Sequence, residues 1–278
     1  MPFADLADVS LFYTDDGIAG EPVVLLHGWG CDSHDWNWQI HHLLSEGYRV
    51  LAPDLRGHGR SSVPESRFAP QDCADDIAYL LDQRGISSVI AIGHSFGAFV
   101  ASALAVEYPS LVRAMIAVDP GYGRNDSLAE TASKLIAALS ESHDSTPAVA
   151  VFEHMDGPET PMSLCFWHRR RVLGTPREVL LKALYGLYRD PREFASRAGA
   201  DSYLARRSCP VLAIHTIPSQ ADWEKALFSH PASRATLWNG TGHWVHQERH
   251  VEFNELVIDW LHQLSTPDEL QADSSLHG

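Results

Sequence analysis

The chain has few cysteines, and none of them form a spaced pair. Only four occur in 278 residues, and they lie far apart, at Cys31, Cys73, Cys165 and Cys209. This scatter excludes a Cys-x-x-Cys motif for zinc or for thiol exchange. It favours free thiols in a reducing compartment, and two disulfides remain compatible with the spacing.

The first residues lack the pattern of a secretory leader. Met1 to Leu6 provide neither a basic segment nor an apolar one. No apolar run in the chain approaches the roughly 20 residues that cross a membrane. We therefore expect a cytoplasmic protein with no membrane partner.

Positive charge is scarce as well. Lysine and arginine number 21 against 36 aspartates and glutamates, which gives a formal net charge of −15. Nucleic acids and anionic membrane surfaces bind basic patches, so this balance argues against both as partners. The hydrophobic fraction of 45% and the charged fraction of 21% are those of an ordinary globular protein. We expect a small-molecule substrate and a monomer or homodimer.

Short apolar runs alternate with helix-like stretches through most of the chain. Seven runs have the composition of strands: residues 8–13, 22–26, 48–52, 88–92, 114–118, 209–214 and 234–238. Helical spacing follows several of them, at 34–46, 72–83, 98–106 and 251–264. Repeated strand–helix units with buried strands predict an α/β fold, a mostly parallel sheet with helices on both faces.

Residues 121–208 interrupt this alternation. They contain no strand-like run, and prolines divide them into helix-like stretches at 127–141, 145–155, 176–189 and 191–205. The pattern predicts a core domain formed by residues 1–120 and 209–265, with an inserted helical unit at 121–208. The polar tail, residues 266–278, is expected to be mobile.

The most informative stretch is Gly93-His94-Ser95-Phe96-Gly97. An apolar run precedes it and a helix-like stretch follows it, so a Gly-x-Ser-x-Gly pattern stands at a sharp strand-to-helix turn. Such a turn projects the serine hydroxyl above the sheet edge, and the glycines allow strand and helix to pass closely. The N–H of Phe96 then lies at a helix N-terminus, where developing negative charge is stabilised.

Several reactive side chains follow predicted strands directly. They are His27, Asp54, Ser95, Asp119 and His243. Ligands of parallel α/β sheets bind at the carboxyl ends of the strands. These side chains are therefore expected to converge on one edge of the sheet.

Together the motifs resemble the α/β-hydrolase superfamily, in its compact form with a helical cap. The resemblance covers residues 7–265 and rests on pieces in a fixed order: His27-Gly28-Trp29-Gly30, Asp54-x-x-Gly57-x-Gly59-x-Ser61, the Ser95 turn and Gly242-His243. It implies an eight-stranded sheet, with residues 121–208 as the cap. It is specific for the fold and says little about the substrate.

The resemblance also implies roles for individual residues. Ser95 is the nucleophile, and His243 is the general base that takes its proton. The backbone N–H groups of Trp29 and Phe96 form the oxyanion hole. His27 orders the oxyanion loop by hydrogen bonding, and no cofactor or metal is implied. Asp54 belongs to a structural turn.

The acid of the triad is open between two positions. Many of these enzymes carry it in a loop after the penultimate strand, where this chain reads His215-Thr216-Ile217 and the nearest carboxylate is Asp222. Others, similar to zearalenone-lactone hydrolases and cofactor-free quinolone dioxygenases, carry it one strand earlier, which corresponds to Asp119. We favour Asp119, because Asp222 falls at an expected helix start, where helix-dipole stabilisation explains an aspartate.

Two further groups of residues have both a functional and a structural interpretation. His246 and His250 have a spacing that zinc can use, but a solvated helix start explains them better because no third ligand is evident. His27 and four aromatic residues are candidates for substrate contact: Trp36, Trp167, Tyr188 and Trp244. An aromatic or hydrophobic substrate of small to medium size fits them.

The leading functional interpretation is a serine hydrolase that cleaves an ester or lactone through an acyl-enzyme. Ser95 excludes haloalkane dehalogenases and epoxide hydrolases, which place a nucleophilic aspartate in this turn. The alternatives are a cofactor-independent ring-cleaving dioxygenase that uses a His–Asp dyad, a C–C bond hydrolase with the same triad, and a ligand receptor that only binds.

Overall fold

A computed structural model of the chain describes residues 2–17, 19–123 and 126–264. The tail predicted to be mobile, 266–278, lies outside these described residues. An eight-stranded sheet has the order β1-β2-β4-β3-β5-β6-β7-β8. The strands are β1 (Phe3–Asp5), β2 (Ser10–Asp16), β3 (Pro22–Leu26), β4 (Arg49–Pro53), β5 (Val89–His94), β6 (Val112–Val118), β7 (Val211–His215) and β8 (Arg234–Leu237).

The sheet is parallel from β4 to β8, and β1 and β2 pair antiparallel at one edge. The eight-stranded, mostly parallel sheet is therefore confirmed. Successive residues of a strand point to opposite faces, and β3 shows the result. Val24 and Leu26 join one apolar cluster, while Val23 and Leu25 join another. Both faces of the central strands are buried, which explains their continuous apolar runs.

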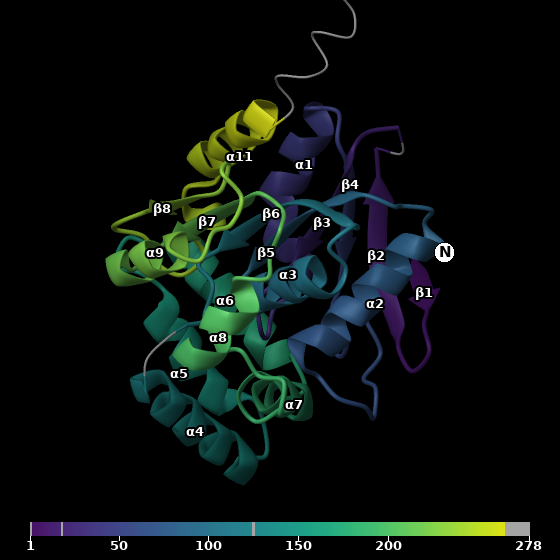
Figure 1. Cartoon of the computed structure of the whole chain (residues 1–278). Coiled ribbons are helices and arrows are strands. Elements are labelled where there is room, and N and C mark those ends of the chain that lie inside the picture. Colours follow the sequence, from purple (N-terminus) through teal and green to yellow (C-terminus); the bar gives the residue numbers. More distant parts are fainter. Residues whose placement is uncertain (1, 18, 124–125, 265–278) are drawn as a thin grey trace, which may run out of the picture.

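Helices cover each face of the sheet (Figure 1). One apolar cluster holds residues of α2 (Pro70–Gln83) and α3 (Phe96–Glu107), and the other holds residues of α1 (Asn37–Ser45) and α11 (His250–Leu264). Short helices complete the loops at the sheet edge. They are η1 (Ser33–Trp36), α9 (Pro218–Lys225) and α10 (Val245–Glu248).

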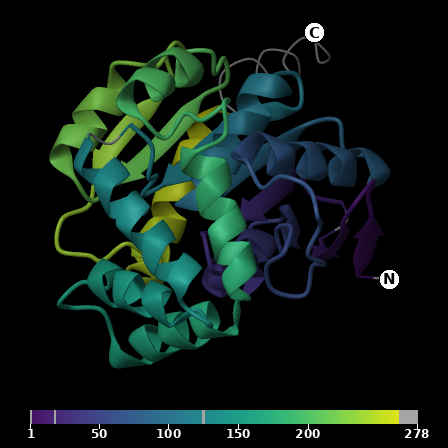
Figure 2. The same cartoon turned by 90° about the horizontal axis from the view of Figure 1, so that it is seen from below.

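The segment between β6 and β7 is helical, and its helices lie below the sheet in the view of Figure 1 and group together in Figure 2. They are α4 (Asp126–Glu141), α5 (Thr146–Met155), α6 (Met162–Gly174), α7 (Arg177–Tyr188) and α8 (Arg197–Leu204). The predictions for α4, α5 and α7 are close to the observed bounds. α8 is shorter than the stretch predicted at 191–205.

α6 is a helix that the sequence interpretation missed. Its inner face consists of Leu164, His168, Arg171 and Val172, which follow helical spacing. Two of these four side chains are polar, so no apolar stripe marks the helix in the sequence. Burial of a histidine and an arginine on this face brings charge and hydrogen-bonding groups toward the core.

Two expectations from composition concern the cysteines and membrane segments. All four cysteines are free in the structure, as the sequence favoured. Among the helices of the described residues, none combines the length and the apolar character that a bilayer crossing requires.

The closest backbone approach in the Ser95 turn gives a first testable prediction. A Cβ at Gly97 would lie 2.0 Å from the carbonyl oxygen of Leu26. We expect Gly97→Ala to lower the free energy of unfolding by about 3 kcal/mol or more, because neither backbone can move aside. Urea unfolding measures the change.

Gly174, in the last turn of α6, provides the matched control for Gly97. No atom lies within 4 Å of the position a Cβ would take there. Gly174→Ala should be neutral or stabilising by about 0.5–1 kcal/mol, as for a glycine in a helix. A wild-type unfolding midpoint for Gly97→Ala would contradict the close packing of α3 against β3.

Candidate active site

Ser95 stands at the turn between β5 and α3 in a strained backbone conformation. Its φ of 51° and ψ of −113° are values that residues other than glycine rarely adopt. The Ser95 N–H donates to the carbonyl of Val118, at 3.0 Å, which ties the turn to the end of β6. A Cβ at Gly93 would lie 2.1 Å from the carbonyl oxygen of Gly97, so the flanking glycines permit the turn. The Ser95 side chain is half-buried.

His243 and Asp119 are joined by a short hydrogen bond. The Nδ1 atom of His243 lies 2.6 Å from Oδ2 of Asp119, and both residues are buried. A carboxylate only accepts, so Nδ1 carries the hydrogen and Nε2 presents its lone pair. Among the described residues, Nε2 of His243 has no hydrogen-bond partner. The imidazole is therefore in the tautomer that can accept a proton at Nε2.

Asp119 is fixed by the strand next to its own. It follows β6 with a φ of 39°, and its N–H donates to the carbonyl of Ile214 at 2.7 Å. Its Oδ1 accepts from the N–H of Thr216 at 3.0 Å and from the Thr216 hydroxyl at 2.9 Å. Asp222 is exposed on α9. Of the two candidate acids, the structure brings Asp119 to His243.

A buried charge network supports the strand end that carries Thr216. Glu224 contacts Nε2 of His215 at 2.7 Å, and Nη1 of Arg207 and the hydroxyl of Tyr122 at 2.8 Å each. Burial alone would raise the pKa of Glu224, but Arg207 and His215 hold it at about 2. The sequence interpretation did not identify this network, because a single glutamate in a helix is usually solvated.

The loop after β3 approaches the Ser95 turn closely. A Cβ at Gly28 would lie 3.5 Å from Cβ of Ser95. His27 is fully buried, and its Nε2 accepts from the Leu55 N–H at 2.9 Å. Its Nδ1 therefore carries the hydrogen that is donated to the Gly28 carbonyl, at 2.8 Å. His27 thus orders the loop, and its buried ring is not accessible to a substrate.

The two predicted oxyanion donors have no acceptor among the hydrogen bonds of the described residues. Phe96 is the first residue of α3, and the first N–H groups of a helix have no partner within the helix. The N–H of Trp29 donates to no group among the described residues. The Trp29 side chain is held by its Nε1, which donates to the carbonyl of Leu180 at 3.1 Å.

Behind Phe96, a buried histidine gives a prediction about pH. His58 stacks against Phe96, and burial, together with neighbouring His27, lowers the pKa of His58 to about 3. The unfolded chain binds a proton below pH 6.5, but the folded chain does not until about pH 3. Protonation of His58 in the unfolded chain therefore lowers the free energy of unfolding as the pH falls below 6.5, by about 2 kcal/mol at pH 5, and has no effect above pH 6.5.

The His58→Asn variant isolates this contribution, because its amide can still donate to the Arg56 carbonyl that His58 contacts. Urea unfolding at pH 8, 6.5 and 5 should show a shallower loss for His58→Asn than for the wild type. Equal losses in both proteins would show that His58 takes up its proton while folded.

Asp54 and its neighbours form the structural turn that the sequence indicated. The fully buried Asp54 carboxylate accepts from the N–H groups of Ser33 and Arg60, at 2.8 Å each. Arg56 forms a two-point contact with Asp76, at 2.7 Å for both bonds. The bond from Ser33 holds the loop after β4 beside the segment after β3, and the contact with Asp76 holds the same loop against α2.

The aromatic candidates divide into buried and accessible residues. Trp36 and Trp244 are almost fully buried. Trp36 packs over His246, with ring centroids 4.4 Å apart, and Trp244 stacks on His168 at 3.8 Å. The structure thus differs from the predicted substrate contacts at these two positions, because both rings fill the core. Tyr188 is half-buried at the end of α7.

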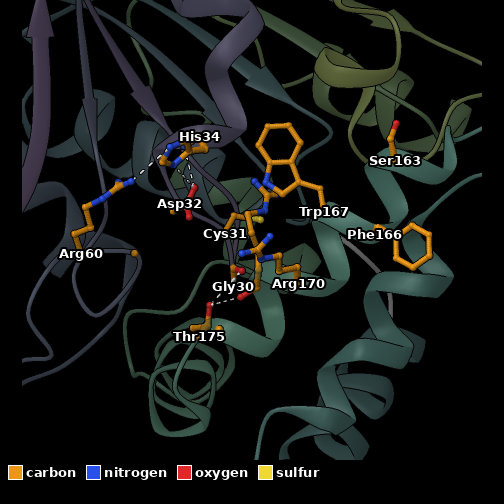
Figure 3. A pocket seen from close by; sticks show the side chains of 13 residues that line it. Gly30, Cys31, Asp32, His34, Arg60, Ser163, Phe166, Trp167, Arg170 and Thr175 are labelled. Atoms are coloured by element: carbon orange, nitrogen blue, oxygen red, sulfur yellow. Dashed lines mark hydrogen bonds and ion pairs between the residues drawn. The ribbon is translucent and has the colours of Figure 1, made fainter.

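Trp167 is half-buried and lines a cavity of about 800 Å³ beside α6 (Figure 3). The walls come from the loop after β3, the loop that holds Arg60, and α6. Ser95 and His243 are not among the lining residues. Trp167 therefore faces a different space from the nucleophile in this structure.

The pair His246 and His250 does not form the two-histidine face of one helix. His246 belongs to α10 and His250 begins α11, with Arg249 between the helices. His246 is fully buried, so the expected solvated helix start is wrong at this position. His250 stacks on Trp38, with ring centroids 5.5 Å apart.

Comparisons with known proteins agree with the fold. Residues 21–153 match a protein-family model described as alpha/beta hydrolase fold. A solved structure of a thermophilic esterase from Thermogutta terrifontis superposes with a TM-score of 0.81 and 24% identity, and covers 95% of this chain and 97% of that one. At this identity the superposition demonstrates the shared fold.

Two curated relatives extend the comparison. The chain is 39% identical over 109 residues to a protein named Epoxide hydrolase from Caballeronia sordidicola. The aligned region covers 38% of this chain and 33% of that protein. It is 28% identical over 269 residues to 2-hydroxy-6-oxononadienedioate/2-hydroxy-6-oxononatrienedioate hydrolase 2 from Pseudomonas putida, over 91% of this chain and 92% of the relative. The first curated matches span about a third of those proteins' length.

Proposed function

From the α/β-hydrolase fold of this chain, we propose that it is a serine hydrolase that cleaves an ester or lactone bond. The observation that supports this most is the bond between His243 and Asp119. It leaves Nε2 of a buried histidine without a partner among the described residues, while Ser95 is held in a strained turn. An activated nucleophile has two parts: a projecting hydroxyl, and a base that can accept its proton.

The proposed reaction uses side chains, main-chain amides and water. Nε2 of His243 takes the Ser95 proton as Oγ attacks the substrate carbonyl carbon, and Asp119 stabilises the resulting imidazolium. The N–H groups of Trp29 and Phe96 hold the oxyanion. His243 then returns the proton to the leaving alcohol, which produces an acyl-Ser95 ester. Water, deprotonated by the same nitrogen, hydrolyses that ester and releases the acid.

The helices α4 to α8 are proposed to form a cap over this site. One contact supports that role: the His243 N–H donates to the carbonyl of Met155, the last residue of α5, at 2.9 Å. A hydrophobic or aromatic substrate of small to medium size is proposed from the half-buried aromatic residues of the same segment, Tyr188 and Trp167, of which Trp167 lines a separate cavity in this structure. Their direct contact with the substrate stays a prediction.

A second candidate is a C–C bond hydrolase with the same catalytic residues. It is favoured by the Pseudomonas putida relative, which aligns over nearly the whole of both chains. Relatives of the epoxide hydrolase type provide less support, because Ser95 occupies the position where those enzymes need an aspartate.

Activity-based labelling with a fluorophosphonate, followed by substrate turnover with and without oxygen, tests these alternatives. We expect covalent labelling of Ser95 and oxygen-independent hydrolysis of esters or lactones. Turnover of 2-hydroxy-6-oxononadienedioate without ester hydrolysis would favour the second candidate. Absence of labelling with oxygen-dependent ring cleavage would indicate the His–Asp dioxygenase.

A further inference from the structure

The main chain of His243 is held on both sides. Its N–H donates to Met155, and its carbonyl lies 3.0 Å from Nε2 of His94. His94 is fully buried at the end of β5, directly before Ser95. One side chain therefore connects the nucleophile turn to the loop that carries the proposed base.

The direction of this contact fixes the state of the His94 ring. A carbonyl oxygen only accepts, so Nε2 of His94 carries the hydrogen and Nδ1 presents a lone pair. Burial, together with the neighbouring rings of His243 and His246, holds the pKa of His94 well below its usual range. The ring is therefore neutral, and it can donate only from Nε2.

Two buried polar side chains, Asp35 and His246, lie beside the other edge of the His94 ring. Nδ1 of His94 lies 4.0 Å from Oδ2 of Asp35, and the ring centroid of His246 lies 4.6 Å from that of His94. Within the described part of the chain, no hydrogen-bond partner exists for Nδ1 of His94, for Oδ2 of Asp35 or for either ring nitrogen of His246. Buried polar atoms of this kind require a shared partner or a direct contact.

The spacing of these groups is too wide for a tetrahedral zinc ion. One atom from each of Asp35, His94 and His246 lies within 4.8 Å of the others. Zinc lies about 2.0–2.2 Å from its nitrogen and oxygen ligands. Two ligand atoms on a tetrahedral zinc ion therefore lie about 3.3–3.6 Å apart, which is closer than the 4.0 Å between Nδ1 of His94 and Oδ2 of Asp35. Arg171 also forms an ion pair with Asp35, and its charge opposes a second cation nearby.

We propose that His94 is a positioning residue for the reaction of His243. Its Nε2–H holds the His243 carbonyl, and the packed ring of His246 keeps the His94 ring in the orientation that makes this contact. The inference rests on the proposed hydrolase function. The His243 ring must remain aligned with Asp119 and Ser95, and a displacement of about 1 Å in such a site costs about 100-fold in rate.

The test compares two substitutions of His94 with a control in the core. His94→Leu removes the donor, and we expect kcat to fall about 30- to 100-fold with KM changed less than about twofold. His94→Gln, whose amide N–H can reach the same carbonyl, should recover kcat to within about fivefold of the wild type. Leu104→Ala, a fully buried change on α3, should lower Tm and leave kcat unchanged.

Each outcome of this experiment supports or overturns the inference. A wild-type kcat for His94→Leu, or equal losses for His94→Leu and His94→Gln, would overturn the positioning role while ester hydrolysis by the wild type persists. Failure of the wild type to hydrolyse esters or to be labelled overturns the proposed function itself. If His94→Leu does not fold, His94→Phe keeps the ring shape without the donor. One equivalent of tightly bound zinc would identify a metal site instead.

Discussion

Ser95→Ala should reduce ester hydrolysis by about 10⁵- to 10⁶-fold, because no other group takes over the attack on the carbonyl carbon. The fold should remain, since the half-buried hydroxyl fills no core space and alanine can occupy the same turn. Stopped-flow or steady-state turnover measures the rate, and fluorophosphonate labelling should disappear with it.

Ser102→Ala is the matched control. Ser102 is fully buried on α3, and its hydroxyl contacts Sδ of Met115 at 3.8 Å. It should retain full labelling and turnover. Substantial turnover by Ser95→Ala would contradict the acyl-enzyme, and dependence of that turnover on oxygen would favour chemistry by His243 and Asp119 alone.

The positions of the central strands along the chain were accessible from the sequence because burial on both faces leaves a clear pattern. The central strands, such as β3 and β5, are continuous apolar runs that end in turn residues. β1 has only three residues, two of them exposed, so it carries no such pattern and was not identified individually. α6 was missed for the opposite reason, since its buried face includes His168 and Arg171.

Some residues of the site could be predicted from the sequence, and others could not. His243 and Asp119 were predicted to converge because each follows a strand, and topology places strand ends at one edge of a sheet. Thr216 and Met155 act on these residues partly through their own main-chain groups. Any residue type supplies a main-chain N–H or C=O, so no pattern in the sequence marks these partners.

The sequence did not show which aromatic side chains fill the core and which line a cavity. Trp36 and Trp167 both stand in helical segments, and composition does not distinguish them. Trp36 points into the core against His246, whereas Trp167 lies at a cavity wall. A shift of one residue along a helix turns a side chain by about 100° about the helix axis, which is enough to move it from the core to a cavity wall. His246 was misjudged for the same reason, because α10 turns it inward.

The last prediction concerns the acid. Thr216 donates two hydrogen bonds to Oδ1 of Asp119, and Oδ2 accepts from Nδ1 of His243. In Asp119→Asn, the amide oxygen must stay toward the Thr216 donors, which leaves the amide NH₂ facing His243. Nδ1 of His243 would then have to accept, so the ring hydrogen moves to Nε2 and the base can no longer take the Ser95 proton. A wrong tautomer of this kind lowers kcat by about 10⁴-fold.

Asp222→Asn is the matched control, because the same change of charge is made on the exposed surface of α9. It should leave kcat near the wild-type value and alter stability by a few tenths of a kcal/mol at most. Measuring kcat and Tm for both variants separates catalysis from support of the turn after β6. A large loss of Tm with little loss of kcat in Asp119→Asn would assign Asp119 to that turn. A crippled Asp222→Asn beside an active Asp119→Asn would contradict the choice of acid, because loss of the acid that fixes the tautomer of His243 lowers the rate without unfolding the protein.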